Sequence, residues 1–277
     1  MPRLDRELTI RGLARSRTQA AQFISEGAVS VAGEPARKAS QEVAADQEIT
    51  VRLSRLDAYV SRAAHKLLGA LAEFPEIAPA GKRCLDAGAS TGGFSQVLLE
   101  AGAREVLAVD VGHGQLVPEL RADPRVQVHE GLNVRDLVPE LIGGPAQLTV
   151  ADLSFISLRL VLAALAGATA APGDLLVMVK PQFEVGRDRL AKTGVVGSDQ
   201  ERRRAVSGVA AAALEADLAL CGLARSPLPG QDGNIEYFLW LRKPGAGGQS
   251  KLGVQAPGAD GAEGFLRHWW PGERKSG

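Results

Sequence analysis

Four charged residues occur within or beside apolar segments of the sequence, where a charge without a partner is costly. They are two lysines and two carboxylates: Lys66, Asp152, Lys180 and Glu236. If these residues meet in the fold, the two lysines and two carboxylates can neutralise one another. A lysine whose pKa is lowered by burial and by a neighbouring cation can then accept a proton from a weakly acidic hydroxyl. The set is therefore a candidate for activating a hydroxyl nucleophile.

The four residues are expected to have different roles. Lys180 ends a strongly apolar run, and we predict that it is the base or the group that orients the hydroxyl. Asp152 and Glu236 would orient the two lysines, and Lys66 shares a helix face with Arg62. Each residue also has a structural alternative. Lys180 can extend to solvent from a strand end, Glu236 can face outward, and Lys66 can be an exposed helix lysine.

A glycine-rich turn lies upstream, in the segment RCLDAGASTGGFSQVLLEAG. An apolar strand ends in Asp86, glycines follow, and a helix begins near Phe94, so backbone N–H groups can face a ligand at the helix N-terminus. The spacing of Gly88 and Gly92, with Ser90 between them, departs from the G-x-G-x-x-G pattern of dinucleotide-binding proteins. It matches the D-x-G-x-x-x-G pattern of class I methyltransferases, which predicts S-adenosylmethionine as cofactor.

Two later positions complete the predicted cofactor site. Asp110 ends the next strand, where its carboxylate can accept hydrogen bonds from both ribose hydroxyls. Asn133 follows the third strand and can bond the adenine edge. The predicted cofactor-binding residues are Asp86, Gly88, Ala89, Ser90, Thr91, Gly92, Gly93, Phe94, Asp110 and Asn133.

The residues around Asp152 argue against two other methyl-transfer chemistries. Asp152 is followed by Leu153 and Ser154, whereas amino-methylating DNA enzymes typically have Pro-Pro and an aromatic residue there. Cytosine-C5 enzymes need a Pro-Cys nucleophile, and neither Cys84 nor Cys221 follows a proline.

Strand-like and helical segments alternate around these residues. The expected strands are Arg83–Ala87, Glu105–Val109, Val126–His129, Leu148–Asp152, Leu175–Val179 and Glu236–Leu241. Ala- and Leu-rich helical segments lie between them, which predicts an α/β domain with a mostly parallel, Rossmann-like sheet. Such sheets bind ligands at the carboxyl ends of their strands.

Residues 1–56 are predicted to form a separate, small α+β unit. Helical patterns at Leu8–Leu13 and Arg17–Glu26 precede strand patterns at Ala28–Gly33 and around Val51. Arginines gather at its start and are candidate phosphate contacts. Together with Arg62, the predicted RNA-binding residues are Arg3, Arg6, Arg11, Arg15 and Arg17. The alternative for this cluster is a solvated helix face.

The composition sets limits on function. The 32 Lys and Arg balance the 32 Asp and Glu, so contact with a nucleic acid must come from a local basic patch. The two cysteines lie far apart and without metal-ligand spacing, which predicts no metal, no disulfide and a cytoplasmic protein. No signal peptide and no membrane span are expected. Residues 244–277 are predicted to be a disordered tail, because residues 244–264 are rich in turn-forming residues. The alternative is that the ending FLRHWWPGERKSG, with two of the three tryptophans, docks on the domain.

The sequence resembles the TlyA family, also called haemolysin-A-like, of bacterial ribosomal RNA 2′-O-methyltransferases. The catalytic domain of that family is similar to the FtsJ-like RNA methyltransferases. The resemblance covers residues 1 to 243, in stretches that include YVSRAAHKL, LDAGASTGGFSQVLL, ADLSFISL, VKPQFE and GNIEYFLWL. It implies a catalytic tetrad at Lys66, Asp152, Lys180 and Glu236, with S-adenosylmethionine as methyl donor.

The resemblance also implies a substrate and a domain plan. The substrate would be a ribose, of a cytidine, in ribosomal RNA or ribosomal subunits. Residues 1–56 would be an alpha-L type RNA-binding domain like that of a ribosomal small-subunit protein. Residues 57–60 would link it to a methyltransferase domain at 61–243. Two other functions stay open, an RNA-binding assembly factor without catalysis and a membrane-active haemolysin.

Overall fold

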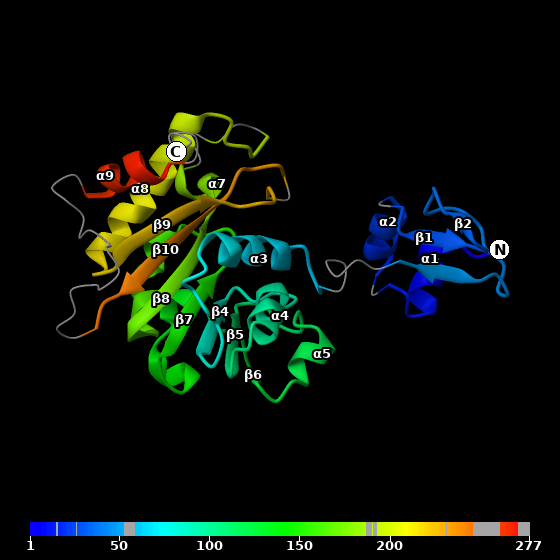
Figure 1. Cartoon of the computed structure of the whole chain (residues 1–277), viewed down its shortest axis with the longest axis horizontal. Coiled ribbons are helices and arrows are strands. Elements are labelled where there is room, and N and C mark those ends of the chain that lie inside the picture. The colour runs from blue at the N-terminus through cyan, green and yellow to red at the C-terminus, as the bar shows by residue number, and fades with distance from the viewer. Residues whose placement is uncertain are drawn as a thin grey trace. The chain divides into compact units, whose positions relative to one another are not determined.

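The computed structural model describes residues 1–14, 16–25, 27–52, 59–186, 190, 193–230, 232–245 and 261–270 (Figure 1). The chain divides into two units, Met1–Tyr59 and Val60–Gly277. This division falls inside the expected linker 57–60, of which residues 57 and 58 lie outside the described residues.

The N-terminal unit contains two helices and a small antiparallel sheet. Its helices are α1 (Leu4–Ile10) and α2 (Arg17–Ser25), and its strands are β1 (Val29–Val31), β2 (Glu34–Pro35) and β3 (Ile49–Val51), in the order β2-β1-β3. Helix α1 begins earlier than the sequence predicted. Leu4 and Leu8 lie one helical turn apart and are both fully buried, so packing extends the helix toward the N-terminus. Gly27 follows α2 with a φ of +71°, a conformation that favours glycine at a helix end.

The second unit is built on a seven-stranded sheet in the order β6-β5-β4-β7-β8-β10-β9. The strands β4, β5, β6, β7 and β8 run parallel to one another, whereas β10 runs antiparallel to both β8 and β9. The strands are β4 (Arg83–Ala87), β5 (Glu105–Asp110), β6 (Val126–Glu130), β7 (Ala146–Ala151), β8 (Thr169–Val179), β9 (Ala219–Arg225) and β10 (Tyr237–Lys243). The prediction of a mostly parallel α/β sheet is confirmed.

One strand, β9, was not predicted from the sequence. Its small residues obscure the alternation of apolar and polar side chains that identifies a strand. Gly222 must be small because a Cβ there would lie 2.6 Å from the ring of Phe74. The close approach of an aromatic ring therefore requires a glycine at this position of the strand.

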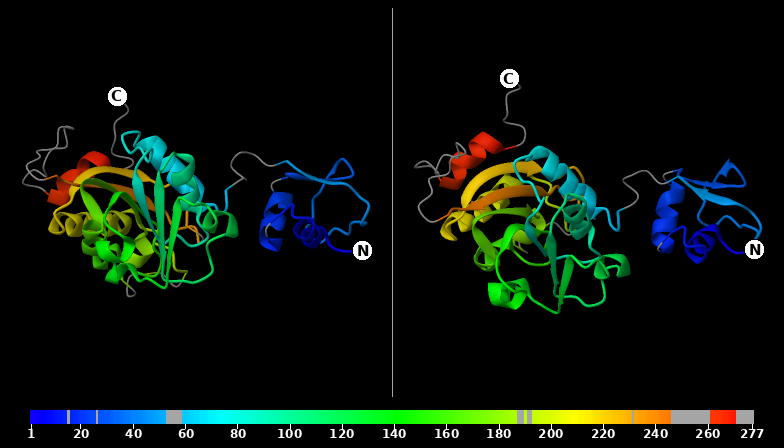
Figure 2. Two further views of the ribbon diagram at one scale, coloured as in Figure 1. Left: turned by 90° about the horizontal axis from the view of Figure 1, so that it is seen from below. Right: turned by 60° about the horizontal axis from the view of Figure 1, so that its bottom comes forward.

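Helices cover both faces of the sheet (Figure 2). On one face lie α3 (Ala63–Glu73) and α4 (Gly93–Glu100), where Phe94 stacks on Phe238 at a ring distance of 6.2 Å. On the other face lie α6 (Leu162–Gly167) and α8 (Asp199–Glu215), whose apolar residues share one core with Val177 and Leu239. The shorter elements are α5 (Pro118–Arg121), α7 (Pro181–Glu184), η1 (Val134–Asp136), η2 (Pro139–Ile142) and η3 (Leu158–Leu160).

The predicted disorder of the tail is wrong for residues 261–270. Helix α9 (Gly261–Trp269) packs against α8 and β9, and the Trp270 ring lies 5.1 Å from that of Tyr237. The Trp270 indole N–H donates to the Asp199 carboxylate at 3.2 Å. The low-complexity residues before α9 dominated the sequence pattern, whereas burial of its apolar side chains orders the helix. Residues 246–260 and 271–277 lie outside the described residues.

The expectations about membranes and metals concern the helices and the polar side-chain clusters of the described residues. None of their helices is both long and apolar enough to cross a bilayer. They contain no group of three or more His, Cys, Asp or Glu side chains that could hold a metal ion. Cys84 and Cys221 are both buried and free, and burial raises the pKa of each thiol to about 12.

Candidate active site

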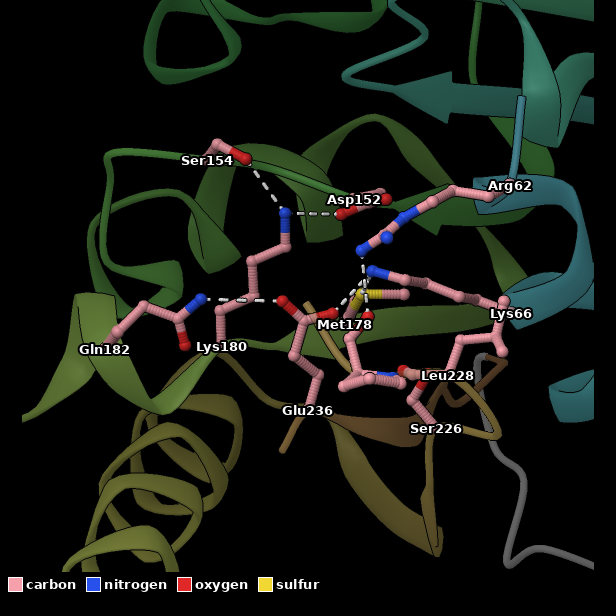
Figure 3. A network of polar contacts seen from close by, with 11 residues as sticks. Arg62, Lys66, Asp152, Ser154, Met178, Lys180, Gln182, Ser226, Leu228 and Glu236 are labelled. Carbon is pink, nitrogen blue, oxygen red and sulfur yellow. Dashed lines mark hydrogen bonds and ion pairs between the residues drawn. The ribbon is translucent and has the colours of Figure 1, made fainter. Parts of the chain in front are cut away.

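The four residues predicted for catalysis meet in one cleft of the second unit (Figure 3). Lys66 comes from α3, Asp152 and Lys180 follow β7 and β8, and Glu236 precedes β10. These three strands are neighbours in the sheet, so their adjoining ends bring the side chains together. The cleft has a volume of about 680 Å³.

The register of β10 on β8 explains one of these encounters. Tyr237 pairs with Val179 in the antiparallel ladder, so the next positions along the two strands are Glu236 and Lys180. Ala151 pairs with Val177 in the parallel ladder between β7 and β8, and this places Asp152 beside the end of β8. The sheet therefore positions three of the four residues through its backbone hydrogen bonds.

The tetrad consists of two ion pairs. Lys66 Nζ lies 2.6 Å from Glu236 Oε2, and these side chains are 7% and 2% exposed. Lys180 Nζ lies 2.7 Å from Asp152 Oδ1, and these side chains are 10% and 15% exposed. Removing a charge from water costs several kcal/mol, and a close partner compensates for much of that cost. Pairing thus allows four charges to share a cleft.

Two polar residues beside the tetrad were not identified from the sequence. Lys180 Nζ donates to Ser154 Oγ at 2.8 Å, and Gln182 Nε2 donates to Glu236 Oε1 at 3.4 Å. Ser154 follows Asp152 by two positions, and Gln182 follows Lys180 by two positions. This spacing is the sequence feature from which the two residues could have been predicted as part of the site. Figure 3 shows Lys180 between Asp152 and Ser154, with Gln182 on the far side of Glu236 from Lys66.

The glycine-rich loop adjoins the residue Asp152 of the tetrad. Gly88 has a φ of +88°, and a Cβ there would lie 2.7 Å from the backbone oxygen of Asp152. Gly92 has a φ of +101°, and a Cβ there would overlap the side chain of Leu120. The sequence assigned these glycines to cofactor approach. The structure adds a second reason, because glycine lets the loop pack against the end of β7 and against α5.

Asp110 organises the same loop from the end of β5. Its carboxylate accepts hydrogen bonds from the N–H of Ser90 at 2.8 Å and from the N–H of Gly112 at 2.7 Å. The sequence predicted ribose contacts for this carboxylate. Each oxygen can accept a further hydrogen bond, so loop anchoring and ribose binding are compatible.

Asn133 and Asp86 make contacts that the sequence did not predict. Asn133 Oδ1 accepts from the N–H of Arg135 at 3.0 Å and caps η1, which leaves its amide N–H groups for other partners. Asp86 is fully buried below the loop, where Ser95 Oγ donates to its Oδ2 at 2.7 Å. Burial, together with the nearby charges of Asp152 and Asp110, raises the pKa of Asp86 to about 7, although the hydrogen bond from Ser95 lowers it. The direct cofactor contacts of both residues stay predictions.

Arg62 is the one predicted RNA-binding residue that belongs to this cleft. Its guanidinium donates to the Pro229 carbonyl at 3.0 Å and lines the cleft with Lys66. The other predicted arginines belong to the N-terminal unit. Arg15 among them lies outside the described residues.

The arginines of the N-terminal unit have distinct surroundings. Arg3 and Arg17 both bond the buried carboxylate of Asp5, with nitrogen–oxygen distances down to 3.1 Å and 2.8 Å. These guanidiniums hold the pKa of Asp5 well below its usual range. Arg11 pairs with Glu7 and donates to the backbone carbonyls of residues 44, 45 and 47. Its contacts favour a structural role, whereas Arg6 is exposed on α1.

Comparisons with known proteins agree with this geometry. Residues 59–243 match the FtsJ-like methyltransferase family, and residues 2–49 match the S4 domain. The chain is 55% identical, over 87% of its length and 89% of the relative, to the 16S/23S rRNA (cytidine-2′-O)-methyltransferase TlyA of Mycobacterium tuberculosis. It is 35% identical to Hemolysin A of Brachyspira hyodysenteriae, over 85% of this chain and 98% of that one.

A solved structure extends the similarity to the fold of almost the whole chain. A Streptococcus thermophilus protein that carries a hemolysin name aligns with a TM-score of 0.71 and 34% identity. The alignment covers 96% of this chain and 94% of that one. The chain therefore belongs to the TlyA family of ribosomal RNA 2′-O-methyltransferases, with an S4 domain followed by an FtsJ-like methyltransferase domain.

Proposed function

We propose that this protein transfers a methyl group from S-adenosylmethionine to the 2′-hydroxyl of a cytidine ribose in ribosomal RNA. The observation that carries the proposal is the pair of buried lysine–carboxylate contacts in one cleft, next to a glycine-rich loop. The cytidine and the ribosomal substrate are taken from the name of the M. tuberculosis relative. Such a substrate places the activity in the cytoplasm.

The residues at the ends of β4 and β5 suit S-adenosylmethionine. Positive φ angles at Gly88, Ser90 and Gly92 turn the loop sharply before α4, whose first N–H groups face outward from the helix N-terminus. Asp110 provides a carboxylate beside this loop, and Asn133 provides an exposed amide after β6. When bound, the cofactor supplies an electrophilic methyl group on its sulfonium.

In the proposed mechanism, Lys180 holds and deprotonates the ribose hydroxyl. Its amine accepts the proton at Nζ as the hydroxyl oxygen forms its bond to the methyl carbon and the carbon–sulfur bond breaks. Asp152, at 2.7 Å, stabilises the ammonium that results. The Ser154 hydroxyl accepts a hydrogen bond from Lys180 Nζ at 2.8 Å and so adds to the stabilisation of the ammonium.

The Lys66–Glu236 pair and Arg62 position the substrate in this proposal. Lys66 adds positive charge to the cleft wall, and Glu236 holds that charge in place. Arg62 would contact a phosphate next to the target nucleotide, because it lines the same cleft and its guanidinium has several donors. Arg3, Arg6 and Arg17 of the S4 domain would contact phosphates elsewhere on the ribosomal RNA.

Lys180→Ala tests the proposed mechanism. The single-turnover rate on ribosomal RNA should fall at least ~10²-fold, the effect of losing a general base. Affinity for S-adenosylmethionine should change little, because the lysine faces the RNA hydroxyl. Lys180→Arg should not restore the rate, since guanidinium stays protonated. In the wild type the rate should rise with pH, because only the uncharged amine accepts a proton.

Lys82→Ala is a matched control. Lys82 precedes β4 at the opposite end of the sheet and pairs with Asp174 at 3.9 Å. This variant should keep the wild-type rate. A folded Lys180→Ala protein with a near-normal single-turnover rate would refute the assignment and make Lys66 the next candidate base. If the wild-type protein bound ribosomal RNA but transferred no tritium from labelled S-adenosylmethionine, it would be an assembly factor without catalysis.

A further inference from the structure

A buried carboxylate outside the tetrad lies close to the catalytic lysine in the sequence. Glu184 is the last residue of α7, four positions after Lys180, and its side chain is 2% exposed. Glu184 has no role in the proposed transfer of the proton to Lys180. A buried carboxylate must be compensated, and the partners of Glu184 show what it does.

Within the described part of the chain, the partners of the Glu184 carboxylate lie on one turn. Ser157 Oγ donates to Oε2 at 2.5 Å, and the Leu158 N–H donates to Oε1 at 2.7 Å. Arg159 Nε donates to Oε2 at 3.3 Å, while its Nη2 donates to the Glu184 carbonyl at 3.2 Å. The carboxylate thus anchors residues 157–159, where η3 begins.

This turn ends the loop that starts at Asp152. Within the loop, Ser154 accepts the hydrogen bond from Lys180, and Phe155 has a φ of +64° and is 92% exposed. A left-handed conformation at a bulky residue costs of order 1–3 kcal/mol and persists only where the surroundings hold it. The Phe155 ring contacts that of Phe183 on α7 at a centroid distance of 5.4 Å, so contacts with the α7 segment hold the shape of the loop.

Polar contacts join the loop to the α7 segment at two points, and the rings of Phe155 and Phe183 form a further contact with centroids 5.4 Å apart. Lys180 bonds Ser154 at one point, and Glu184 bonds Ser157 at the other. Since Lys180 and Glu184 are four positions apart on one short segment, fixing the second contact constrains the first. Loss of the Glu184 contacts would let Ser154 move away from the Lys180 amine.

We propose that Glu184 is a positioning residue for methyl transfer, which keeps Ser154 within hydrogen-bond distance of Lys180 by anchoring residues 157–159. The inference rests on the proposed role of Lys180. Glu184→Gln tests it, because the amide keeps one acceptor oxygen and replaces the other with a donor. The single-turnover rate of the full-length protein should fall about tenfold, with affinity for S-adenosylmethionine within about twofold of the wild type.

Two readouts separate positioning from a merely structural role. Loss of the hydrogen bond from the charged lysine disfavours the ammonium form, so the midpoint of the rate–pH profile should move to lower pH. Ser154→Ala should produce the same shift, and the double variant should lose no more than either single variant, because both act through one contact. Glu105→Gln is the control. It weakens the Arg83 pair at the amino ends of β4 and β5 and should lower stability without moving the midpoint.

The outcomes are distinct. A wild-type rate and pH midpoint in folded Glu184→Gln, or rate losses that multiply with those of Ser154→Ala, would overturn the inference while Lys180→Ala still lost activity. A normal rate in Lys180→Ala would instead overturn the proposed mechanism. If Glu184→Gln does not fold, Ser157→Ala is the second variant, which removes the hydroxyl that donates to Glu184 and accepts from Arg159. It should lower the rate and move the midpoint in the same direction, and an unchanged midpoint would count against the inference.

Discussion

The buried pair of Lys66 and Glu236 leads to a quantitative prediction about stability. Lys66→Met keeps much of the apolar volume of the lysine but removes its charge. Glu236 then remains with a carboxylate that is 2% exposed and has lost a partner at 2.6 Å. Gln182, whose amide lies 3.4 Å from the other carboxylate oxygen, offers only a weak neutral bond in its place.

The magnitude follows from this burial. Leaving one member of a buried pair without its partner costs about 3–5 kcal/mol of unfolding free energy. Typical domains have an unfolding free energy of about 5–15 kcal/mol, so this loss is a large fraction of the total stability. The double variant Lys66→Met/Glu236→Leu removes both charges and should regain most of the loss, since apolar replacement of a buried pair is often neutral or stabilising. It should nevertheless be inactive.

Urea unfolding followed by tryptophan fluorescence measures this effect in the relevant unit. The three tryptophans, Trp240, Trp269 and Trp270, all belong to the methyltransferase unit, so the signal does not report on the S4 domain. Lys82→Met, which affects a looser pair with a distance of 3.9 Å, should cost about 0–1 kcal/mol as a control. A Lys66→Met cost below about 1 kcal/mol, or a double variant no more stable than the single one, would refute the reasoning.

Three further predictions concern other parts of the chain. Burial raises the pKa of Asp86 from 3.8 to about 7, so ionisation disfavours the folded state as pH rises through this range. Relative to the wild type, Asp86→Asn should therefore gain up to ~4 kcal/mol of unfolding free energy between pH 4 and pH 8, and a pH-independent difference in urea unfolding would contradict this. Trp270→Ala should cost the methyltransferase unit about 3–5 kcal/mol in the same assay, because its buried ring packs on Tyr237, and a loss below about 1 kcal/mol would mean that α9 contributes little. Arg11→Ala should lower the thermal stability of the S4 domain, whereas Arg6→Ala should keep that stability and reduce the salt dependence of ribosomal RNA binding by about one unit of slope.

Local patterns in the sequence were sufficient to predict the main elements of the fold. Six of the seven large-sheet strands were predicted because apolar runs of strand length end at turn-forming or charged residues. The strand β9 was missed because its pattern is interrupted at Gly222, where Phe74 from another part of the chain approaches too closely for a side chain. The helix α9 was missed for a related reason, because its order depends on docking against α8 and β9.

The site, like the fold, has features that the sequence predicted and features that it did not. The identity of the tetrad and the glycine-rich loop could be read from residue types at strand ends, because parallel strands present their carboxyl ends at one edge of the sheet. The contacts that individual residues make could not be predicted from residue types. Asp110 binds loop N–H groups, Arg11 holds backbone carbonyls, and Glu184 anchors a turn, and each of these contacts joins residues that are distant in the sequence or hidden within a loop.

The sequence by itself therefore identified the four charged residues that meet in the cleft, and it separated the small N-terminal unit from the methyltransferase unit. Only the tertiary structure decided how the charges pair. Lys66 could have met either carboxylate, and it meets Glu236, 170 residues away, because β10 enters the sheet antiparallel to β8. Lys180 meets Asp152 because β7 and β8 are parallel neighbours. Strand order and register depend on packing across the whole domain, and local residue patterns do not contain that information.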